Sequence, residues 1–411
     1  MTVNEALTAV LDGIFPLESE AVGLREGLGR VIAEPVSAGR DLPPWNNSSM
    51  DGFALRSGDT GAVPTVLRII EEIPAGYQPR KSIGKNEASR IMTGGVLPEG
   101  ADAVIRIEDT DCPDADHVRV REKTVPHENV RFRGEDVREG DVVLSGNTLI
   151  GPADIAMAAG VGRTGFRVYR KPRVAILATG DELAEPGTAV GSHQIYNSNG
   201  YALSAQVAAA GGIPVGLGIA RDDREDLAGK LNSASGYDVL LVSGGVSVGK
   251  YDLVRDVLSE LGCDLTFWRV AMKPGHPVAF GTLDGRRVFG LPGNPVSTQV
   301  TFEEFVRPVL LRMAGHSAIF RPTVRAVLDE TIVKNNDGKM HFVRGVVRYE
   351  NGGFRAKPTG AQGSGLISSM TKANGLLILP ETSLKVGAGD PIVVQLLDKG
   401  LAGQSEPGFW G

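Results

Sequence analysis

Cysteine, excess positive charge and long apolar runs are all scarce in this sequence. The 411-residue chain has two cysteines, Cys112 and Cys263, too few and too far apart for a disulfide framework or a thiolate metal cage. Its 43 Lys and Arg against 49 Asp and Glu give a formal net charge of -6, which argues against a general nucleic-acid-binding surface. No apolar run reaches the roughly 18 residues of a membrane span, and the first ten residues lack the basic start of a signal peptide. We therefore expect a cytoplasmic protein that binds neither nucleic acid nor membrane.

Several motifs of common enzyme and binding classes are also missing. Aromatic residues make up 6% of the chain, too few for an obvious base-stacking platform. The sequence contains no HExxH zinc motif, and the loop at 243–252 is neither a Walker A loop nor a GxGxxG dinucleotide fingerprint. By contrast, 54 glycines and 24 prolines predict many turns and segments where backbone approaches a ligand closely.

The first 170 residues predict short strands with little helix. Apolar residues at helical spacing predict a short amphipathic helix over 6–14, and GPADIAMAAGVG predicts another over 151–162, capped by Gly160. Prolines, asparagines and serines argue against regular structure through most of 41–54. Between them lies a β-rich region, with strands expected at 65–70, 102–107, 117–121 and 141–144.

From residue 173 the pattern changes to alternating apolar strands and helices. Strands are expected at 173–178, 213–218 and 238–242, and helices at 200–210, 223–232 and 251–261, which predicts a parallel sheet with helices on both faces. Two β-prone segments (278–283, 287–291) and a long helix over 296–313 follow. From residue 323 onward we expect a small all-β domain, then a loose tail.

Three loops in this second half have the composition of anion-binding sites. The strongest is SGGVSVGKYD at 243–252, where glycine backbone N–H groups and serine hydroxyls between a strand and a helix can cradle phosphate; an ordinary tight turn is the alternative. In the second, RVAMKPGHP at 269–277, prolines present Lys273 and His276, although a plain surface loop explains this segment equally well. In the third, GLPGNPVS at 290–297, Asn294 and Pro295 suit the N-cap and first position of a helix, which is itself a sufficient structural explanation.

Carboxylates beside glycine or at turns are usually turn formers or helix caps. Three of them, Glu182, Asp222 and Asp252, follow predicted strands of the parallel domain. Ligands of such sheets bind outside the carboxyl ends of the strands. Three acids on one rim suit a hard divalent ion such as Mg²⁺.

Eight of these segments occur in the order found in one family. SSMDGFA (48–54), RIMTGG (90–95), RGED (133–136), ATGDEL (178–183), YNSNGY (196–201), SGGVSVGKYD (243–252), KPGHP (273–277) and LPGNPVS (291–297) resemble the motifs of molybdopterin molybdenumtransferases. This is the MoeA family, which includes the gephyrin E domain. The resemblance implies an enzyme of molybdenum cofactor biosynthesis that inserts molybdate into adenylylated molybdopterin and releases AMP, with Mg²⁺ as cofactor.

The resemblance also implies roles for individual residues. Those matching family positions at the chemistry are Asp51, Thr93, Asp136, Glu182, Asp222, Asp252 and Lys273, with Glu182, Asp222 and Asp252 as the metal ligands. Arg344 and Ser369 match residues that approach molybdate in eukaryotic relatives. The remaining expected substrate-binding residues are Ser243, Gly244, Gly245, Ser247, Gly249, Arg269, His276, Pro277, Pro292, Gly293, Asn294, Pro295 and Ser297.

The family architecture implies four domains in an L-shaped homodimer whose active site lies between subunits. The expected parts are a discontinuous elongated α+β linker domain (1–40 with 141–170), an inserted β-rich domain (41–140), an α/β molybdopterin-binding domain (171–317), a C-terminal β-barrel domain (318–400) and a tail (401–411). Other cofactor-biosynthesis proteins are candidate partners.

The sequence departs from the common bacterial pattern at two positions, and two other functions stay open. His276 stands where KPGKP has a second lysine, and Arg269 replaces the lysine of FWK. A weaker or pH-sensitive molybdate site, or an altered preference for tungstate, is the resulting hypothesis. The alternatives are a non-catalytic molybdopterin-binding scaffold or carrier, and a molybdopterin adenylyltransferase, which is typically much shorter.

Overall fold

The computed structural model describes residues 1–233, 236–245, 253–350 and 352–397. The chain divides into two compact units, Met1–Glu20 with Tyr169–Gly411, and Ala21–Val168. Each is treated separately below. In the part of the chain that the structure describes, no helix is both long and apolar enough to cross a bilayer.

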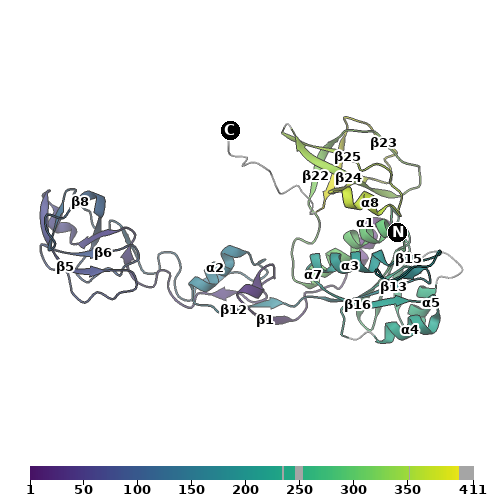
Figure 1. Ribbon diagram of the computed structural model, residues 1–411, viewed down its shortest axis with the longest axis horizontal. Coiled ribbons are helices and arrows are strands. Elements are labelled where there is room, and N and C mark those ends of the chain that lie inside the picture. Colours follow the sequence, from purple (N-terminus) through teal and green to yellow (C-terminus); the bar gives the residue numbers. More distant parts are fainter. Residues whose placement is uncertain (234–235, 246–252, 351, 398–411) are drawn as a thin grey trace. The chain divides into compact units, whose positions relative to one another are not determined.

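The larger unit is organised by a six-stranded sheet, of which β13 and β16 are labelled in Figure 1. The strand order is β16-β13-β17-β21-β20-β18. Its strands are β13 (Arg173–Thr179), β16 (Ile213–Ala220), β17 (Val239–Ser243), β18 (Asp264–Phe267), β20 (Ala279–Leu283) and β21 (Arg286–Leu291). The first four in spatial order are parallel, whereas β20 and β18 run antiparallel. The expected parallel sheet is therefore present, with an antiparallel edge that the sequence pattern did not reveal.

Alternate residues of the central strands enter two different cores. Val239 and Leu241 of β17 pack with α1 (Val3–Leu11), α3 (Ser198–Ala209), α6 (Pro295–Thr301) and α7 (Arg307–Met313). Leu240 and Val242 pack with α4 (Arg224–Ser233) and α5 (Leu253–Glu260) on the opposite face. Because successive strand side chains point to opposite faces, a strand buried on both faces is apolar throughout.

The long helix expected over 296–313 is interrupted. A π-helical stretch, η4 (Phe302–Val306), separates α6 from α7. Pro308 follows directly and has no N–H to donate to the Glu304 carbonyl one turn earlier, which accounts for the change in winding. Both Glu303 and Glu304 are buried in this stretch.

The C-terminal part of the larger unit is a second six-stranded sheet, β19-β24-β25-β22-β28-β26, closed by a further β24–β26 pairing. Its elements are β19 (Met272–Lys273), β22 (Thr323–Leu328), β24 (Met340–Glu350), β25 (Gly353–Pro358), α8 (Ile367–Lys372), β26 (Gly375–Leu379) and β28 (Pro391–Leu396). Two minor two-stranded sheets pair β23 (Ile332–Val333) with β27 (Lys385–Val386) and β14 (Leu183–Ala184) with β15 (Ile195–Tyr196). Helix α8 corrects the expectation of an all-β domain. Strand β19 lies in the KPG loop, so this loop pairs in register with β24.

The smaller unit contains a third six-stranded sheet, β7-β4-β6-β5-β9-β8. Its strands are β4 (Gly52–Leu55), β5 (Thr65–Ile73), β6 (Glu87–Ile91), β7 (Ala103–Arg106), β8 (Thr110–Asp111) and β9 (His117–Val120). Short 3₁₀ turns, η1 (Arg25–Gly27), η2 (Ser57–Thr60) and η3 (Ile107–Asp109), lie in the same unit. Phe53, Leu55 and Leu67 are among the residues that fill its core.

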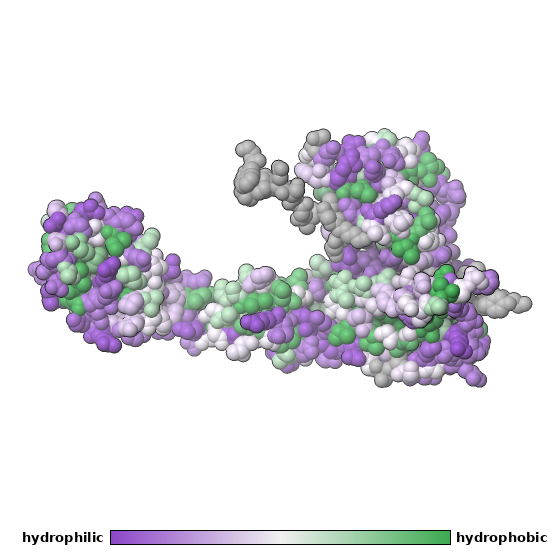
Figure 2. All heavy atoms as spheres, in the orientation of Figure 1, coloured by the Kyte–Doolittle hydropathy of each residue, from purple (hydrophilic) through white to green (hydrophobic). Residues whose placement is uncertain are grey.

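The rest of the smaller unit consists of short strand pairs and one helix. β1 (Ser19–Gly23) pairs with β12 (Gly165–Tyr169), β2 (Val36–Ser37) with β11 (Val142–Leu144), and β3 (Asn47–Ser48) with β10 (Val130–Arg131). The helix, α2 (Pro152–Gly160), includes Gly160, and Val161 is its C-cap, one residue later than expected. Hydrophobic side chains are visible on the surface over the region of α2 and β12 (Figure 2). Exposed apolar residues of the smaller unit include Leu28, Val142 and Leu149.

Candidate functional site

A pocket of about 450 Å³ opens at the carboxyl ends of β13, β17 and β21. This is the end of a parallel sheet at which α/β proteins bind their ligands. Ten of the residues expected from the sequence line it: Glu182, Asp222, Ser243, Gly244, Gly245, Pro277, Pro292, Gly293, Asn294 and Pro295. Ser247, Gly249 and Asp252 lie outside the described residues.

The turn that leaves β17 requires glycine at two successive positions. Gly244 and Gly245 have φ of 98° and 62°, in the left-handed region. A Cβ at Gly244 would lie 2.5 Å from the Thr179 carbonyl oxygen, and one at Gly245 would lie 2.5 Å from Val254. The two glycines therefore let the backbone approach β13 closely and form the floor of the pocket.

The two described acids of the predicted rim, Glu182 and Asp222, both line this pocket. The Asp222 backbone N–H donates to Asp181 Oδ1 at 3.2 Å, which fixes the turn after β16. The carboxyl group of Glu182 lies against Gly180, where a Cβ would meet it at 2.4 Å. Among the described residues, no group of three His, Cys, Asp or Glu side chains is placed to hold a metal ion.

Two pocket residues that the sequence did not single out are Thr179 and Asn199. Asn199 Nδ2 donates to Ser243 Oγ at 2.9 Å and to the Gly293 carbonyl at 2.8 Å, so one amide joins the turns after β17 and β21. Its Oδ1 and the Thr179 hydroxyl are buried and have no hydrogen-bond partner among the described residues. Buried polar atoms are nearly always paired, so both are available to a ligand.

The third predicted loop adopts the expected helix start. Asn294 is the N-cap of α6 and Pro295 its first residue, although no side-chain hydrogen bond accompanies the cap. Ser297 is buried within α6 and is not among the residues that line the pocket.

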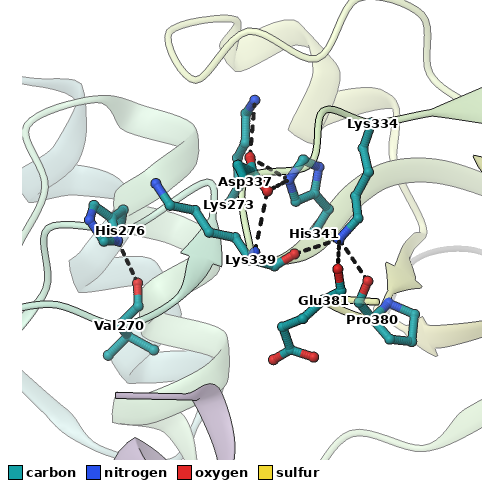
Figure 3. Close-up of polar contacts among 9 residues, drawn as sticks. All are labelled: Val270, Lys273, His276, Lys334, Asp337, Lys339, His341, Pro380 and Glu381. Atoms are coloured by element: carbon teal, nitrogen blue, oxygen red, sulfur yellow. Dashed lines mark hydrogen bonds and ion pairs between the residues drawn. The ribbon is translucent and has the colours of Figure 1, made fainter. Parts of the chain in front are cut away.

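The lining of the pocket does not include Arg269, Lys273 or His276 of the KPG loop. Figure 3 shows Lys273 and His276 with the groups around them. His276 Nδ1 lies 2.7 Å from the Val270 carbonyl oxygen and donates to it. Lys273 is exposed, and its Nζ lies 4.0 Å from Asp337 Oδ2 of the terminal domain. Arg269 is exposed in the same loop. The sequence predicted that these residues and the glycine turn serve the same substrate site. In the structure, Pro277 is the member of this loop that lines the pocket.

Arg344 and Ser369 lie together inside the terminal domain, on β24 and α8. Arg344 is 2% exposed, and its guanidinium donates to Ser369 Oγ at 3.3 Å and to the Phe342 and Gly363 carbonyls at 3.3 and 3.4 Å. Burial lowers the pKa of Arg344 to about 10. All three acceptors are uncharged, so this buried cation lacks a carboxylate partner within the described part of the chain.

Three expected residues lie in the smaller unit. Asp51 Oδ1 accepts from both the backbone N–H and the hydroxyl of Thr93, at 2.7 and 2.8 Å. These two hydrogen bonds, the backbone one first, lower the pKa of the exposed Asp51 carboxyl. The motifs SMDG and MTG therefore meet in the smaller unit. Asp136 is exposed in the turn after Gly134, and its N–H donates to the Leu42 carbonyl at 3.1 Å.

The sheet, its glycine turn and the pocket lie almost entirely within the region that matches the model of a probable molybdopterin binding domain. The models of three family regions match this chain: the MoeA N-terminal region (domains I and II) over residues 1–162, a probable molybdopterin binding domain over 175–312, and the MoeA C-terminal region (domain IV) over 325–397. The chain belongs to the MoeA family.

Relatives that match nearly the whole chain agree with this family assignment. The chain is 33% identical to a protein of Haemophilus influenzae named molybdopterin molybdenumtransferase, covering 96% of this chain and 98% of that one. It is 37% identical, with the same coverage, to molybdopterin molybdenumtransferase 2 of Mycobacterium tuberculosis. Among solved structures, a molybdopterin biosynthesis MoeA protein from Pyrococcus horikoshii is 32% identical, with a TM-score of 0.78 over 96% of this chain and 99% of that chain.

Proposed function

We propose that this protein is a cytoplasmic molybdopterin molybdenumtransferase that inserts molybdate into adenylylated molybdopterin and releases AMP. The observation that carries the proposal is the pocket at the ends of β13, β17 and β21. Its backbone turns suit the phosphates of the adenylate. Its unpaired Thr179 Oγ1 and Asn199 Oδ1 suit N–H or O–H donors on the pterin or nucleoside.

A divalent ion fits the donor set of this pocket. Glu182 and Asp222 supply carboxylate oxygens, the ligands that Mg²⁺ prefers, and Mg²⁺ commonly keeps several waters beside one or two carboxylates. Asp252 is the third proposed ligand. When bound, Mg²⁺ would neutralise charge on the pyrophosphate link.

Molybdate is proposed to bind to cations of the KPG loop and the terminal domain. Lys273 is exposed and free to move, and Arg344 is a buried guanidinium paired with uncharged oxygens alone among the described residues. Both properties favour an incoming dianion. Arg269, His276 and Ser369 are proposed to assist.

The proposed assembly is a homodimer in which both subunits contribute to each active site. Asp51, Thr93 and Asp136 belong to the unit that does not contain the pocket. Mixing inactive Asp51→Ala and Glu182→Ala proteins tests this arrangement. Random re-pairing should restore roughly a quarter of wild-type activity, because half of the dimers are mixed and one of their two sites is intact. Full inactivity of the mixture would contradict shared sites.

Molybdate-dependent AMP release tests the reaction itself. The expected result is AMP release from adenylylated molybdopterin that needs molybdate and is lost in Glu182→Ala. Tight binding without AMP release would favour the scaffold or carrier, and formation of the adenylate from molybdopterin and ATP would favour the adenylyltransferase.

A further inference from the structure

A small charged cluster links the KPG loop to the terminal domain (Figure 3). It contains Lys273 from the loop, Asp337 and Lys334 from the segment between β23 and β24, and His341 from β24. None of the motifs recognised in the sequence contains Asp337, Lys334 or His341. The cluster is held in place by pairing of the two backbones, in which Lys273 lies opposite His341.

The carboxylate of Asp337 is held rigidly. His341 Nε2 lies 3.1 and 3.0 Å from its two oxygens, and the Lys339 N–H donates to Oδ1 at 3.2 Å. The loop that carries it is fixed in turn by the buried ammonium of Lys334. That group donates to the Lys339 and Pro380 carbonyls, each at 2.6 Å, and to the Glu381 carbonyl at 3.2 Å. Asp337 therefore cannot move away when a ligand arrives.

Asp337 keeps its negative charge at neutral pH. Burial alone would raise the pKa of Asp337, but the hydrogen bond from His341, the Lys339 N–H and the charge of Lys273 together lower it. Burial lowers the pKa of His341, against the opposing effect of Asp337, so His341 is neutral near pH 7. A neutral imidazole donates one hydrogen bond to the carboxylate without cancelling its charge.

Lys273 is exposed by comparison. Its side chain is 56% exposed, and its Nζ is 4.0 Å from Asp337 Oδ2, longer than a hydrogen-bonded pair. Such an exposed pair is weak and is easily broken. Its main chain is fixed by β19, so the flexible four-carbon stem alone decides where the ammonium lies.

We propose that Asp337 is the resident counter-ion of Lys273, which an incoming oxyanion must displace, and that it thereby limits the affinity of the site for molybdate. This inference rests on the proposed function, in which Lys273 binds the oxyanion. The fixed carboxylate competes for the ammonium and also repels a dianion bound near it. The repulsion scales with the double charge of the ligand, whereas the exposed ion pair contributes little, so the carboxylate weakens anion binding on balance.

The direction in which Asp337→Asn changes molybdate affinity tests the proposal against the alternative that Asp337 only holds Lys273 in place. Asp337→Asn keeps an oxygen that accepts from Lys339 and His341 but removes the charge. Titration of the full-length protein with sodium molybdate by calorimetry should show binding tightened three- to tenfold. Asp337→Glu, which keeps the charge, should stay within twofold of wild type. Glu330→Gln removes the same charge from an exposed position of the same domain and should have no effect.

The contrary results distinguish a failure of the counter-ion role of Asp337 from a failure of the oxyanion role of Lys273. Unchanged or weaker molybdate binding in Asp337→Asn, with unfolding like that of wild type, overturns the counter-ion role and favours a tether. Equal tightening in Asp337→Glu or Glu330→Gln overturns it as well, because charge at this position would then not be the cause. A Lys273→Ala variant that binds molybdate like wild type would instead refute the proposed oxyanion role of Lys273, on which the inference depends.

Discussion

The buried carboxyl of Glu304 predicts a pH-dependent stability that one substitution removes. Glu304 lies in the π-helical stretch between α6 and α7 and is 8% exposed. Its Oε1 accepts from Gln395 Nε2 of β28 at 2.9 Å. Burial raises the pKa of Glu304 from 4.5 to about 8, an effect that the Gln395 hydrogen bond partly opposes. The folded protein therefore holds this proton across most of the neutral range.

The sign and size of this pH dependence follow from the linkage between proton binding and the free energy of unfolding. The folded-state pKa is raised, so the contribution of Glu304 to stability is complete below pH 4.5 and is lost as the pH rises through 8. At about 1.4 kcal/mol per pKa unit, the loss reaches about 5 kcal/mol as an upper limit. Glu304→Gln keeps the acceptor for Gln395 and has no proton to lose. We expect it to lie within about 1 kcal/mol of wild type at pH 5 and to exceed it by several kcal/mol at pH 8.

Unfolding in urea at pH 5, 6, 7 and 8 measures this difference. Glu330→Gln, at an exposed position, is the matched control and should change nothing at any pH. A Glu304→Gln difference that is the same at all four pH values would refute the reasoning, because it would show that Glu304 has similar proton affinity in the folded and unfolded chains.

Two further predictions concern the pocket and the KPG loop. Gly244→Ala should destabilise the protein by about 1–3 kcal/mol in thermal unfolding, because φ is 98° and the new Cβ would lie 2.5 Å from the Thr179 carbonyl oxygen. The control is Gly229→Ala in helix α4, where a Cβ would meet no atom within 4 Å. This variant should stabilise the protein by about 0.5–1 kcal/mol. His276→Lys should tighten molybdate binding, because it adds a permanent cation at a position where the Nδ1–H of the histidine is already used by the Val270 carbonyl. Unchanged molybdate affinity in this variant would count against a role for His276.

The sheet of the α/β domain was predictable because its central strands are buried on both faces. β13 and β17 appear as uninterrupted apolar runs, and the helices between them have clear turns at each end. The antiparallel edge was not predictable in the same way. β18 is a short edge strand with alternating burial, a pattern that a loop also produces.

The helix interruption and α8 were missed for local reasons. Apolar periodicity continues through residues 296–313, so it predicts one helix, while the effect of Pro308 on the preceding turn is visible only in the backbone. Helix α8 has six residues and is rich in serine and threonine, which gives weak helical periodicity. Because of it, Ser369 lies beside Arg344, a contact between residues far apart in the chain.

The candidate site was predictable where its residues are local and unpredictable where they depend on folding. The glycine turn and the Asn294 helix start follow from their own sequence. Asn199 joins two turns that lie 44 and 94 residues away, so its motif alone did not reveal the role. Asp337 likewise meets Lys273 only because β19 pairs with β24.

A crystal structure of Glu182→Ala with adenylylated molybdopterin tests the central claim most directly. The account predicts that the pyrophosphate lies at the turn of Gly244 and Gly245, with Thr179 Oγ1 and Asn199 Oδ1 each accepting a hydrogen bond from the ligand. Ligand bound at another surface, with both oxygens still unpaired, would contradict it.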